Sequence, residues 1–381
     1  MNGKMSLILA LAAVSFSACG AARSSGPPSR VPTAGSAGSA AGIIGVPFVV
    51  VGGTDGSVSI YGLDAAAGKL TLLKSVNAGN YPSFVALDPA HARLYAVNEA
   101  DAKVAAFAVN PQTLELTFLN RVDSGGGAPA FVSVDRSGKF VLVANYNGGT
   151  ARVIPIGADG SLGAFSDHES PGMNPHLFVT DPANRFAFVP NKGSDTISQY
   201  AFDAVTGKLT ANPVPSVKTA AGAGPRHLAF HPNGKLAYVI NELDDTLVAY
   251  AYDAASGQLT LLHALSTLPA EANGAGNTCA EVVVAPSGAF VYGSNRGHDS
   301  IATFAIGGDG KLTFVGTTPS GGNVPRSFAL SADGSLMLVA NESGNVTSFR
   351  VDPATGALSK LLVNDVPPKP QFVGIFSFPR P

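Results

Sequence analysis

The sequence has few charged residues, and their signs nearly balance. Of 381 residues, 13% are charged, and the formal net charge is −2 at pH 7. A nucleic-acid-binding protein is expected to carry a basic patch or stripe, so we expect no nucleic-acid partner. Tryptophan is absent, whereas 44 glycines and 27 prolines favour short strands joined by tight turns.

Cysteine is almost absent, which limits redox and metal chemistry. The chain contains Cys19 and Cys279, and the first lies in a segment that we expect to be processed. One remaining cysteine can form neither an intramolecular disulfide nor a cysteine-based metal site. Acidic residues at alternating positions, as a calcium loop requires, are missing as well. We therefore expect no metal and no cofactor.

The first nineteen residues have the pattern of a targeting segment. Lys4 precedes the apolar run "LILALAAVSF", which is too short to span a bilayer. The run leads through small residues to Cys19, and this ending resembles the lipobox of bacterial lipoproteins. Phe16 replaces the usual leucine, so simple signal cleavage is the alternative. We expect an exported protein, either periplasmic or tethered to the outer membrane, with the lipid anchor as its membrane contact.

The next segment, residues 20–46, is composed almost entirely of glycine, alanine, serine and proline. It lacks the large apolar groups that a packed core needs, so we expect a flexible tether. The folded part of the chain should therefore be residues 47–381.

An internal repeat runs through this folded part. A strand-like segment ends in an asparagine six times, at spacings of 47, 46, 50, 54 and 46 residues. The asparagines are Asn98, Asn145, Asn191, Asn241, Asn295 and Asn341. A seventh copy, "VVVGGTDG", has Gly53 in the same place. Such a period is typical of propellers and solenoids, and no 3.6-residue apolar period supports a helical solenoid.

Each repeat has a second anchor, 16 residues before its asparagine. A proline takes this place in five repeats, and Cys279 takes it in the sixth unit of the ring. Two apolar strands lie between the anchors, joined by turns such as "HPNGK", and two further strands follow the asparagine. Four short antiparallel strands per repeat make one blade of a propeller.

The two ends of the repeat region complement each other. The first repeat begins at Phe48 and lacks a first strand, whereas "KPQFVGIFSF" at the C-terminus is a first strand with no successor. Pairing the two closes the ring and removes exposed sheet edges. We therefore predict an all-β, seven-bladed β-propeller whose first blade is closed by the C-terminal strand. Two stacked β-domains would not explain these complementary ends.

Two positions in every repeat should meet at one rim. The first two strands of a blade are antiparallel, so the residue after the proline anchor lies near the residue after the asparagine. In blade order, the first position holds Gln371, Ser83, Ala130, His176, Arg226, Ala280 and Arg326, and the second holds Thr54, Glu99, Tyr146, Lys192, Glu242, Arg296 and Glu342. Charge concentrates in blades four to seven. Because arginine pairs bidentately with carboxylate or phosphate, this predicts a pocket for a small anion.

Structural roles compete with that interpretation. Asn-Glu occurs three times and Pro-Arg twice, so both pairs also fit a packing rule of the repeat. A structural ion pair explains Arg226 and Glu242 equally well. The anchor asparagines are expected to brace turns. His227 and His231 are expected to pack or to brace turns, and Glu281 to stabilise a turn or strand.

Two long segments resemble the seven-bladed lactonase family. They are "GPRHLAFHPNGKLAYVINELDDTLVAYAYD" and "AEVVVAPSGAFVYGSNRGHDSIATFAI". The family includes propeller-type 6-phosphogluconolactonases and carboxy-cis,cis-muconate cyclases, and the similarity extends over about residues 47–381. The resemblance implies a propeller fold and lactone chemistry.

The resemblance also implies a site. In the family, a histidine on the fourth blade, the arginine of "PRH", the glutamate of "NE" and the arginine of "NRGHDS" line the central funnel. They correspond to His176, Arg226, Glu242 and Arg296, and all four occupy the two rim positions. Asn174 and Ala130 stand where histidines are common in the family, which leaves fewer acid–base groups.

From these residues we predict a monomeric enzyme that acts on a small anionic lactone or sugar-acid-like molecule. It would hydrolyse the lactone or, in the reverse direction, form the lactone ring. Arg226 and Arg296 would hold the anion and stabilise an oxyanion. His176 or Glu242 would act as general base and then as general acid. The residues expected to contact the substrate are Lys192, Arg326 and Glu342. The alternative is a non-enzymatic binding or scaffold propeller of the cell envelope, because fold alone does not determine function.

Overall fold

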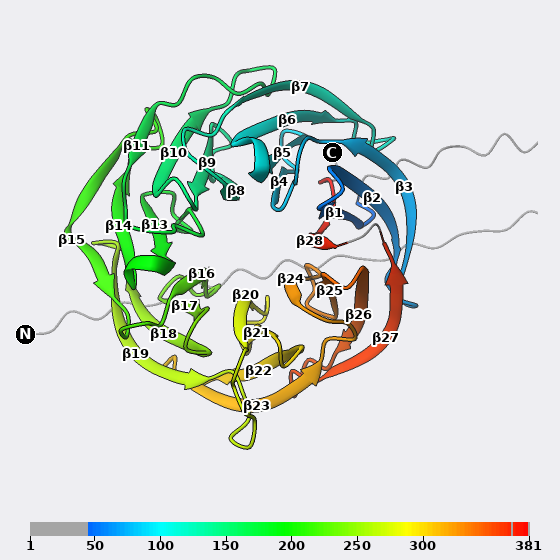
Figure 1. Cartoon of the computed structure of the whole chain (residues 1–381), viewed down its shortest axis with the longest axis vertical. Coiled ribbons are helices and arrows are strands. Elements are labelled where there is room, and N and C mark those ends of the chain that lie inside the picture. Colours follow the sequence, from blue (N-terminus) through cyan, green and yellow to red (C-terminus); the bar gives the residue numbers. More distant parts are fainter. Residues whose placement is uncertain (1–44, 367–368, 380–381) are drawn as a thin grey trace, which may run out of the picture. The chain divides into compact units, whose positions relative to one another are not determined.

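The computed structural model describes residues 45–366 and 369–379, which form seven four-stranded antiparallel sheets. The sheets are arranged as the blades of a ring, each with one strand facing the axis and one at the perimeter (Figure 1). The predicted seven-bladed β-propeller is therefore confirmed. The predicted signal segment with Cys19, and the predicted tether as far as residue 44, lie outside the described residues.

Every blade has the same strand order. The innermost strands are β28 (Pro370–Phe376), β4 (Val85–Asp88), β8 (Pro129–Val134), β12 (Val179–Thr180), β16 (Pro225–Phe230), β20 (Thr278–Val284) and β24 (Pro325–Leu330). The second strands are β1 (Phe48–Gly53), β5 (Arg93–Asn98), β9 (Phe140–Asn145), β13 (Phe186–Asn191), β17 (Leu236–Asn241), β21 (Phe290–Arg296) and β25 (Leu336–Asn341).

The outer half of each blade is equally regular. The third strands are β2 (Ser57–Asp64), β6 (Lys103–Val109), β10 (Thr150–Pro155), β14 (Thr196–Phe202), β18 (Thr246–Asp253), β22 (Ser300–Ile306) and β26 (Asn345–Val351). The outermost strands are β3 (Lys69–Asn77), β7 (Leu116–Asp123), β11 (Asp167–Glu169), β15 (Leu209–Lys218), β19 (Gln258–Ser266), β23 (Leu312–Pro319) and β27 (Leu358–Asp365). The short 3-10 helices are η1 (Glu99–Asp101) and η2 (Lys192–Ser194). Within residues 45–366 and 369–379, no helix is long and apolar enough to cross a membrane.

The first blade is closed by the C-terminal strand, as predicted. β28 pairs antiparallel with β1, from Phe48 opposite Phe376 to Gly53 opposite Pro370. The backbone N–H of Gly45 also donates to the carbonyl of Phe378 at 3.0 Å. The first and last strands of the chain therefore share one sheet, which removes two free edges.

Buried tyrosines connect neighbouring blades. The hydroxyls of Tyr95, Tyr238 and Tyr292 donate to the carbonyls of Gly160, Gly310 and Gly356, at 3.2, 3.3 and 3.1 Å. Each tyrosine lies on a second strand, and each glycine lies in a turn of the following blade. A buried tyrosine usually finds a partner for its hydroxyl, and here the partner orients adjacent blades.

The two anchors of each repeat meet, as the antiparallel register predicted. Pro129, Pro225 and Pro325 are directly opposite the asparagines that end β9, β17 and β25. Cys279 is opposite Asn295 in the same way. The residues that follow the two anchors therefore emerge at one rim.

The anchor asparagines brace turns, also as predicted. The side-chain amides of Asn98, Asn145 and Asn295 donate to the carbonyls of Ala78, Ser124 and Thr267, at 2.7, 2.9 and 3.1 Å. Each carbonyl belongs to the connection from the preceding blade, immediately after its outermost strand. Through this hydrogen bond, each asparagine holds the segment between two blades at the rim.

A β-bulge interrupts several innermost strands just after the anchor. The register shifts between Pro129 and Phe131, between Pro225 and His227, and between Pro325 and Ser327. A bulge changes the direction of side chains and breaks strict alternation. In β16 the four consecutive residues from Pro225 to Leu228 are buried. The bulge therefore lies within a run of consecutive buried residues that includes Arg226 and His227.

Candidate active site

Glu242 lies among three cationic side chains. Its Oε1 is 2.9 Å from Lys192 Nζ and 3.0 Å from Arg296 Nη2, and its Oε2 is 3.1 Å from Arg226 Nε. Lys192 begins η2 in blade four, Arg226 and Glu242 belong to blade five, and Arg296 ends β21 in blade six. Three positive charges surround one negative charge, so the cluster keeps a surplus of positive charge.

The backbone of β20 holds both arginines in place. Arg226 Nη1 donates to the carbonyl of Ala280 at 2.6 Å, and Arg296 Nη2 donates to the carbonyl of Cys279 at 2.8 Å. Arg226 is only 2% exposed and Glu242 only 8%. Charged groups buried and bonded in this way are fixed before any ligand arrives, which is the condition for electrostatic preorganisation.

The three cations determine the protonation state of Glu242. Burial by itself would raise the pKa of this carboxyl, but Arg226, Arg296 and Lys192 outweigh it and lower the pKa to about 2. Burial, Arg296 and Arg326 lower the pKa of the Arg226 guanidinium to about 9, so it stays protonated at neutral pH. Among the described residues, no group of three His, Cys, Asp or Glu side chains is arranged to hold a metal ion.

His176 lies beside this cluster, in the segment before β12. It is 5% exposed, and its backbone N–H donates to the carbonyl of Pro190 at 3.0 Å. Its ring contacts the ring of Tyr146 edge to face, with 5.5 Å between centroids. The Tyr146 hydroxyl in turn accepts a hydrogen bond from Lys192 Nζ at 3.0 Å. The structure thus brings His176 together with the three other residues of the predicted set.

The pKa of His176 lies well below its ordinary value of 6.5. Burial is the main cause, and the positive charges of Arg226 and Arg326 add to it. The imidazole is therefore neutral at neutral pH, with a lone pair that can accept a proton.

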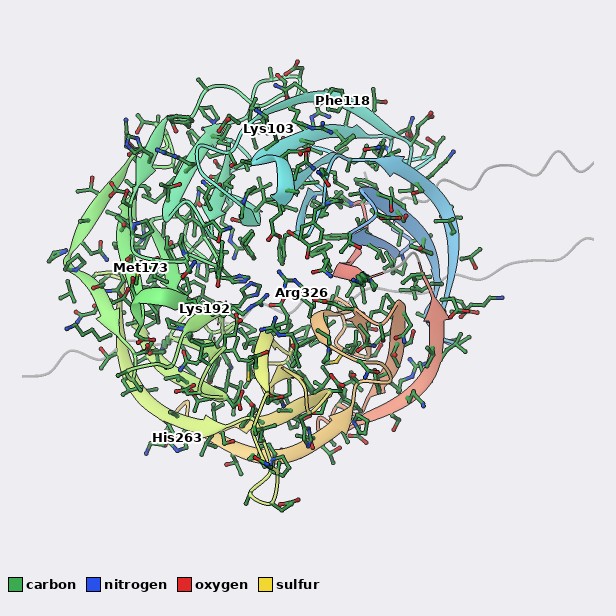
Figure 2. All side chains as sticks on the ribbon, in the orientation of Figure 1. Lys103, Phe118, Met173, Lys192, His263 and Arg326 are labelled. Atoms are coloured by element: carbon green, nitrogen blue, oxygen red, sulfur yellow. The ribbon has the colours of Figure 1, made fainter. Side chains whose placement is uncertain are left out.

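The residues predicted to contact the substrate are divided between two places. Lys192 is part of the cluster around Glu242. Arg326 and Glu342 form a pair in blade seven, with Nη1 and Oε1 3.9 Å apart. Figure 2 shows Arg326 beside the centre of the ring, whereas Phe118 and His263 lie on the perimeter. Since Arg326 also lowers the pKa values of His176 and Arg226, its charge acts on the same site.

His231 braces a turn as predicted, because its Nε2 is 2.9 Å from the carbonyl of Gly288.

The sequence interpretation missed a third position in each repeat, two residues after the anchor. His227 packs, as predicted, but its Nδ1 also lies 2.8 Å from Glu281 Oε1. The available signal was their equal spacing: His227 follows Pro225 by two residues, as Glu281 follows Cys279.

Residues 48–375 match the family described as Lactonase, 7-bladed beta-propeller. The chain belongs to this family. The resemblance drawn from the two sequence segments is therefore confirmed. The protein is therefore a lactonase-like hydrolase, and the alternative of a non-enzymatic scaffold is not favoured.

Relatives of this lactonase align over most of their length. The 6-phosphogluconolactonase of Bacillus subtilis (strain 168) is 35% identical over 323 residues, which cover 80% of this chain and 91% of the relative. That of Serratia proteamaculans (strain 568) is 32% identical over 314 residues, covering 82% and 93%. The solved structure of a periplasmic gluconolactonase from Pseudomonas aeruginosa is similar to this chain with a TM-score of 0.80 and 27% identity. The match covers 87% of this chain and 99% of that one.

Proposed function

We propose that this lactonase hydrolyses a small lactone that carries a second, anionic group, either a phosphate or a carboxylate. The observation that supports this is the surplus positive charge around Glu242, where Lys192, Arg226 and Arg296 face one carboxylate. An anionic substituent would complete the charge balance and pair with the planar guanidinium groups. The names of the Bacillus and Serratia relatives point to 6-phosphogluconolactone, which has this chemistry.

His176 suits the role of general base better than Glu242 does. Both oxygens of Glu242 already face cationic side chains, so this carboxylate is poorly placed to accept a proton from water. The neutral imidazole of His176 can take a proton from water while the hydroxide adds to the lactone carbonyl carbon. Arg226 and Arg296 would stabilise the oxyanion that forms. When the ring C–O bond breaks, His176 returns the proton to the leaving alkoxide. The same residues would serve cyclisation in the reverse direction.

In this scheme Glu242 is a positioning residue. Its two oxygens hold three cationic groups that would otherwise repel one another. All the residues of the scheme belong to one chain, so we propose that the monomer is active.

Replacing Arg226 by lysine tests the proposal. A lysine keeps the charge but cannot reach both Glu242 and the carbonyl of Ala280, because it lacks the fork of the guanidinium. We expect kcat/KM for an anionic lactone to fall about 10²-fold. The assay uses the full chain with a phosphorylated, a carboxylated and an uncharged lactone.

A matched control is Arg136→Lys, because Arg136 is exposed in a turn. It should leave kcat/KM unchanged. Undiminished turnover in Arg226→Lys would contradict the site. A preference of the wild-type protein for the uncharged lactone would instead contradict the anionic substrate class.

We also propose that the protein is exported and lipid-anchored through Cys19. The support is the targeting pattern of residues 4–19 and the similarity to a lactonase described as periplasmic. In a bacterium with an outer membrane, the wild-type chain should incorporate radiolabelled palmitate and fractionate with the envelope. Cys19→Ala should lose the label. Label retained by this variant would contradict the anchor, and wild-type protein confined to the cytoplasm would contradict export.

A further inference from the structure

His227 and Glu281 belong to a second layer of side chains around the axis. This layer consists of the residues two positions after each anchor: Phe372, Phe84, Phe131, Leu177, His227, Glu281 and Ser327. Phe84 contacts the rings of Phe131 and Phe372 with centroids 4.3 and 4.8 Å apart, and Phe131 contacts His227 at 5.3 Å. His227 is therefore packed against apolar rings, and it is only 2% exposed.

Glu281 determines the tautomer of His227. Its Oε1 lies 2.8 Å from His227 Nδ1 and also accepts the backbone N–H of Val282 at 3.1 Å. A carboxylate can only accept, so His227 carries its hydrogen on Nδ1 and a lone pair on Nε2. Burial lowers the pKa of His227, which keeps the ring neutral at neutral pH.

Two ring nitrogens in this region have no partner. They are Nε2 of His227 and Nδ1 of His176, and both are buried. The two rings contact each other edge to face, with centroids 5.2 Å apart and planes 64° apart. Leaving a buried polar atom unpaired destabilises a protein, so two such atoms on neighbouring rings need an explanation. Hydrogen bonds used in catalysis are often long in a ligand-free site and shorten once the substrate binds.

We propose that Glu281 and His227 are positioning residues for His176, an inference that rests on the proposed function. In the substrate-bound site, His227 Nε2 accepts the N–H of His176 Nδ1, which leaves the lone pair of His176 on Nε2. Water then gives its proton to that Nε2 as its oxygen bonds to the carbonyl carbon. The proton stays on His176 until the leaving alkoxide takes it, so no proton passes on to His227 or Glu281.

The charges around the two rings explain why such a carboxylate is needed. Arg226 of blade five and Arg326 of blade seven both act on His176 and on His227, and both disfavour a positive charge there. A general base must nevertheless become cationic for an instant. Glu281 offsets this repulsion, since its charge reaches His176 through the polarised ring of His227.

The first test replaces the nitrogens of His227 and keeps a ring. In His227→Phe we expect kcat to fall about 10²-fold, because a misplaced base loses its alignment, while KM stays unchanged. Glu281→Gln should lower kcat about tenfold, since the amide still accepts but carries no charge. His263→Phe, on the perimeter strand β19 (Figure 2), is the control and should behave as wild type.

A double-mutant cycle separates positioning from packing. In a His176→Phe background, adding His227→Phe should change kcat by less than about twofold, because the two histidines act as one unit. A further loss as large as in the wild-type background, or a rise in KM alone, would overturn the inference. Full activity of His176→Phe would instead overturn the proposed function. If thermal denaturation shows that His227→Phe is unfolded, His227→Gln takes its place in the same cycle.

Discussion

Replacing His176 by phenylalanine is expected to lower kcat for lactone hydrolysis by about 10²- to 10⁴-fold, the range for loss of a general base. Phenylalanine keeps the edge-to-face contact with Tyr146 but has no lone pair to accept a proton. KM should change little, because His176 is neutral and is not one of the cations proposed to hold the anion. Steady-state kinetics on the purified chain measure both constants, with His263→Phe as the matched control.

The pH profile provides an independent check on His176. As a base it is active only when neutral, so activity should be lost as the pH falls through its pKa. Because burial and the neighbouring arginines keep that pKa well below 6.5, kcat/KM should still be on its plateau at pH 6.5 and decline only in more acidic solution. An acid limb centred at or above pH 6.5 would contradict the assignment.

Replacing Glu242 by glutamine is expected to lower the free energy of unfolding by about 3–5 kcal/mol at neutral pH, as when one partner of a buried ion pair is removed. The variant leaves Lys192, Arg226 and Arg296 facing a neutral amide. Arg226, at 2% exposed, has little access to water that could compensate. Denaturant unfolding measures the loss. The control is Glu342→Gln, because Glu342 is 28% exposed and lies 3.9 Å from Arg326, so its removal should cost less than about 1 kcal/mol.

The stabilising effect of Glu242 should also depend on pH, in a direction that its pKa determines. A carboxyl whose pKa falls from 4.5 to about 2 on folding contributes about 3 kcal/mol when it is ionised in both states. That contribution is complete above about pH 4.5 and is lost as the pH falls through about 2. The stability difference between wild type and Glu242→Gln should therefore shrink across this interval. A difference that stays constant down to pH 2 would show that Glu242 acts through packing rather than charge.

Much of the architecture could be predicted from the sequence because a propeller repeats. The asparagine and proline anchors recur at nearly constant spacing, and antiparallel pairing then forces the residues after them to one rim. The repeat register placed Arg226 beside Glu242 and Lys192 on the same rim, whereas the contact between Lys192 and Glu242 appeared only in the structure. It also explained the split first blade, since Phe48 and "KPQFVGIFSF" complement each other.

The second layer could not be predicted in the same way. Strict strand alternation points His227 away from the side that Arg226 faces, so the sequence offers the histidine only as a packing residue. The bulge between Pro225 and His227 breaks that alternation, and its effect on side-chain direction depends on pairing with β17. The contact between His227 and Glu281 is even harder to predict from the sequence, because the two residues are 54 positions apart and belong to different blades.

The repeat and its spacing, by themselves, determined the seven blades, the closure and the one charged rim of this lactonase, because these follow from periodicity and antiparallel pairing. The three-dimensional structure decided what the charges do to one another. Three cations on Glu242 make it a poor base, and burial beside arginines keeps His176 neutral. Such effects depend on distance and burial, which no linear pattern specifies, and they turn a charged rim into a candidate active site with assigned roles.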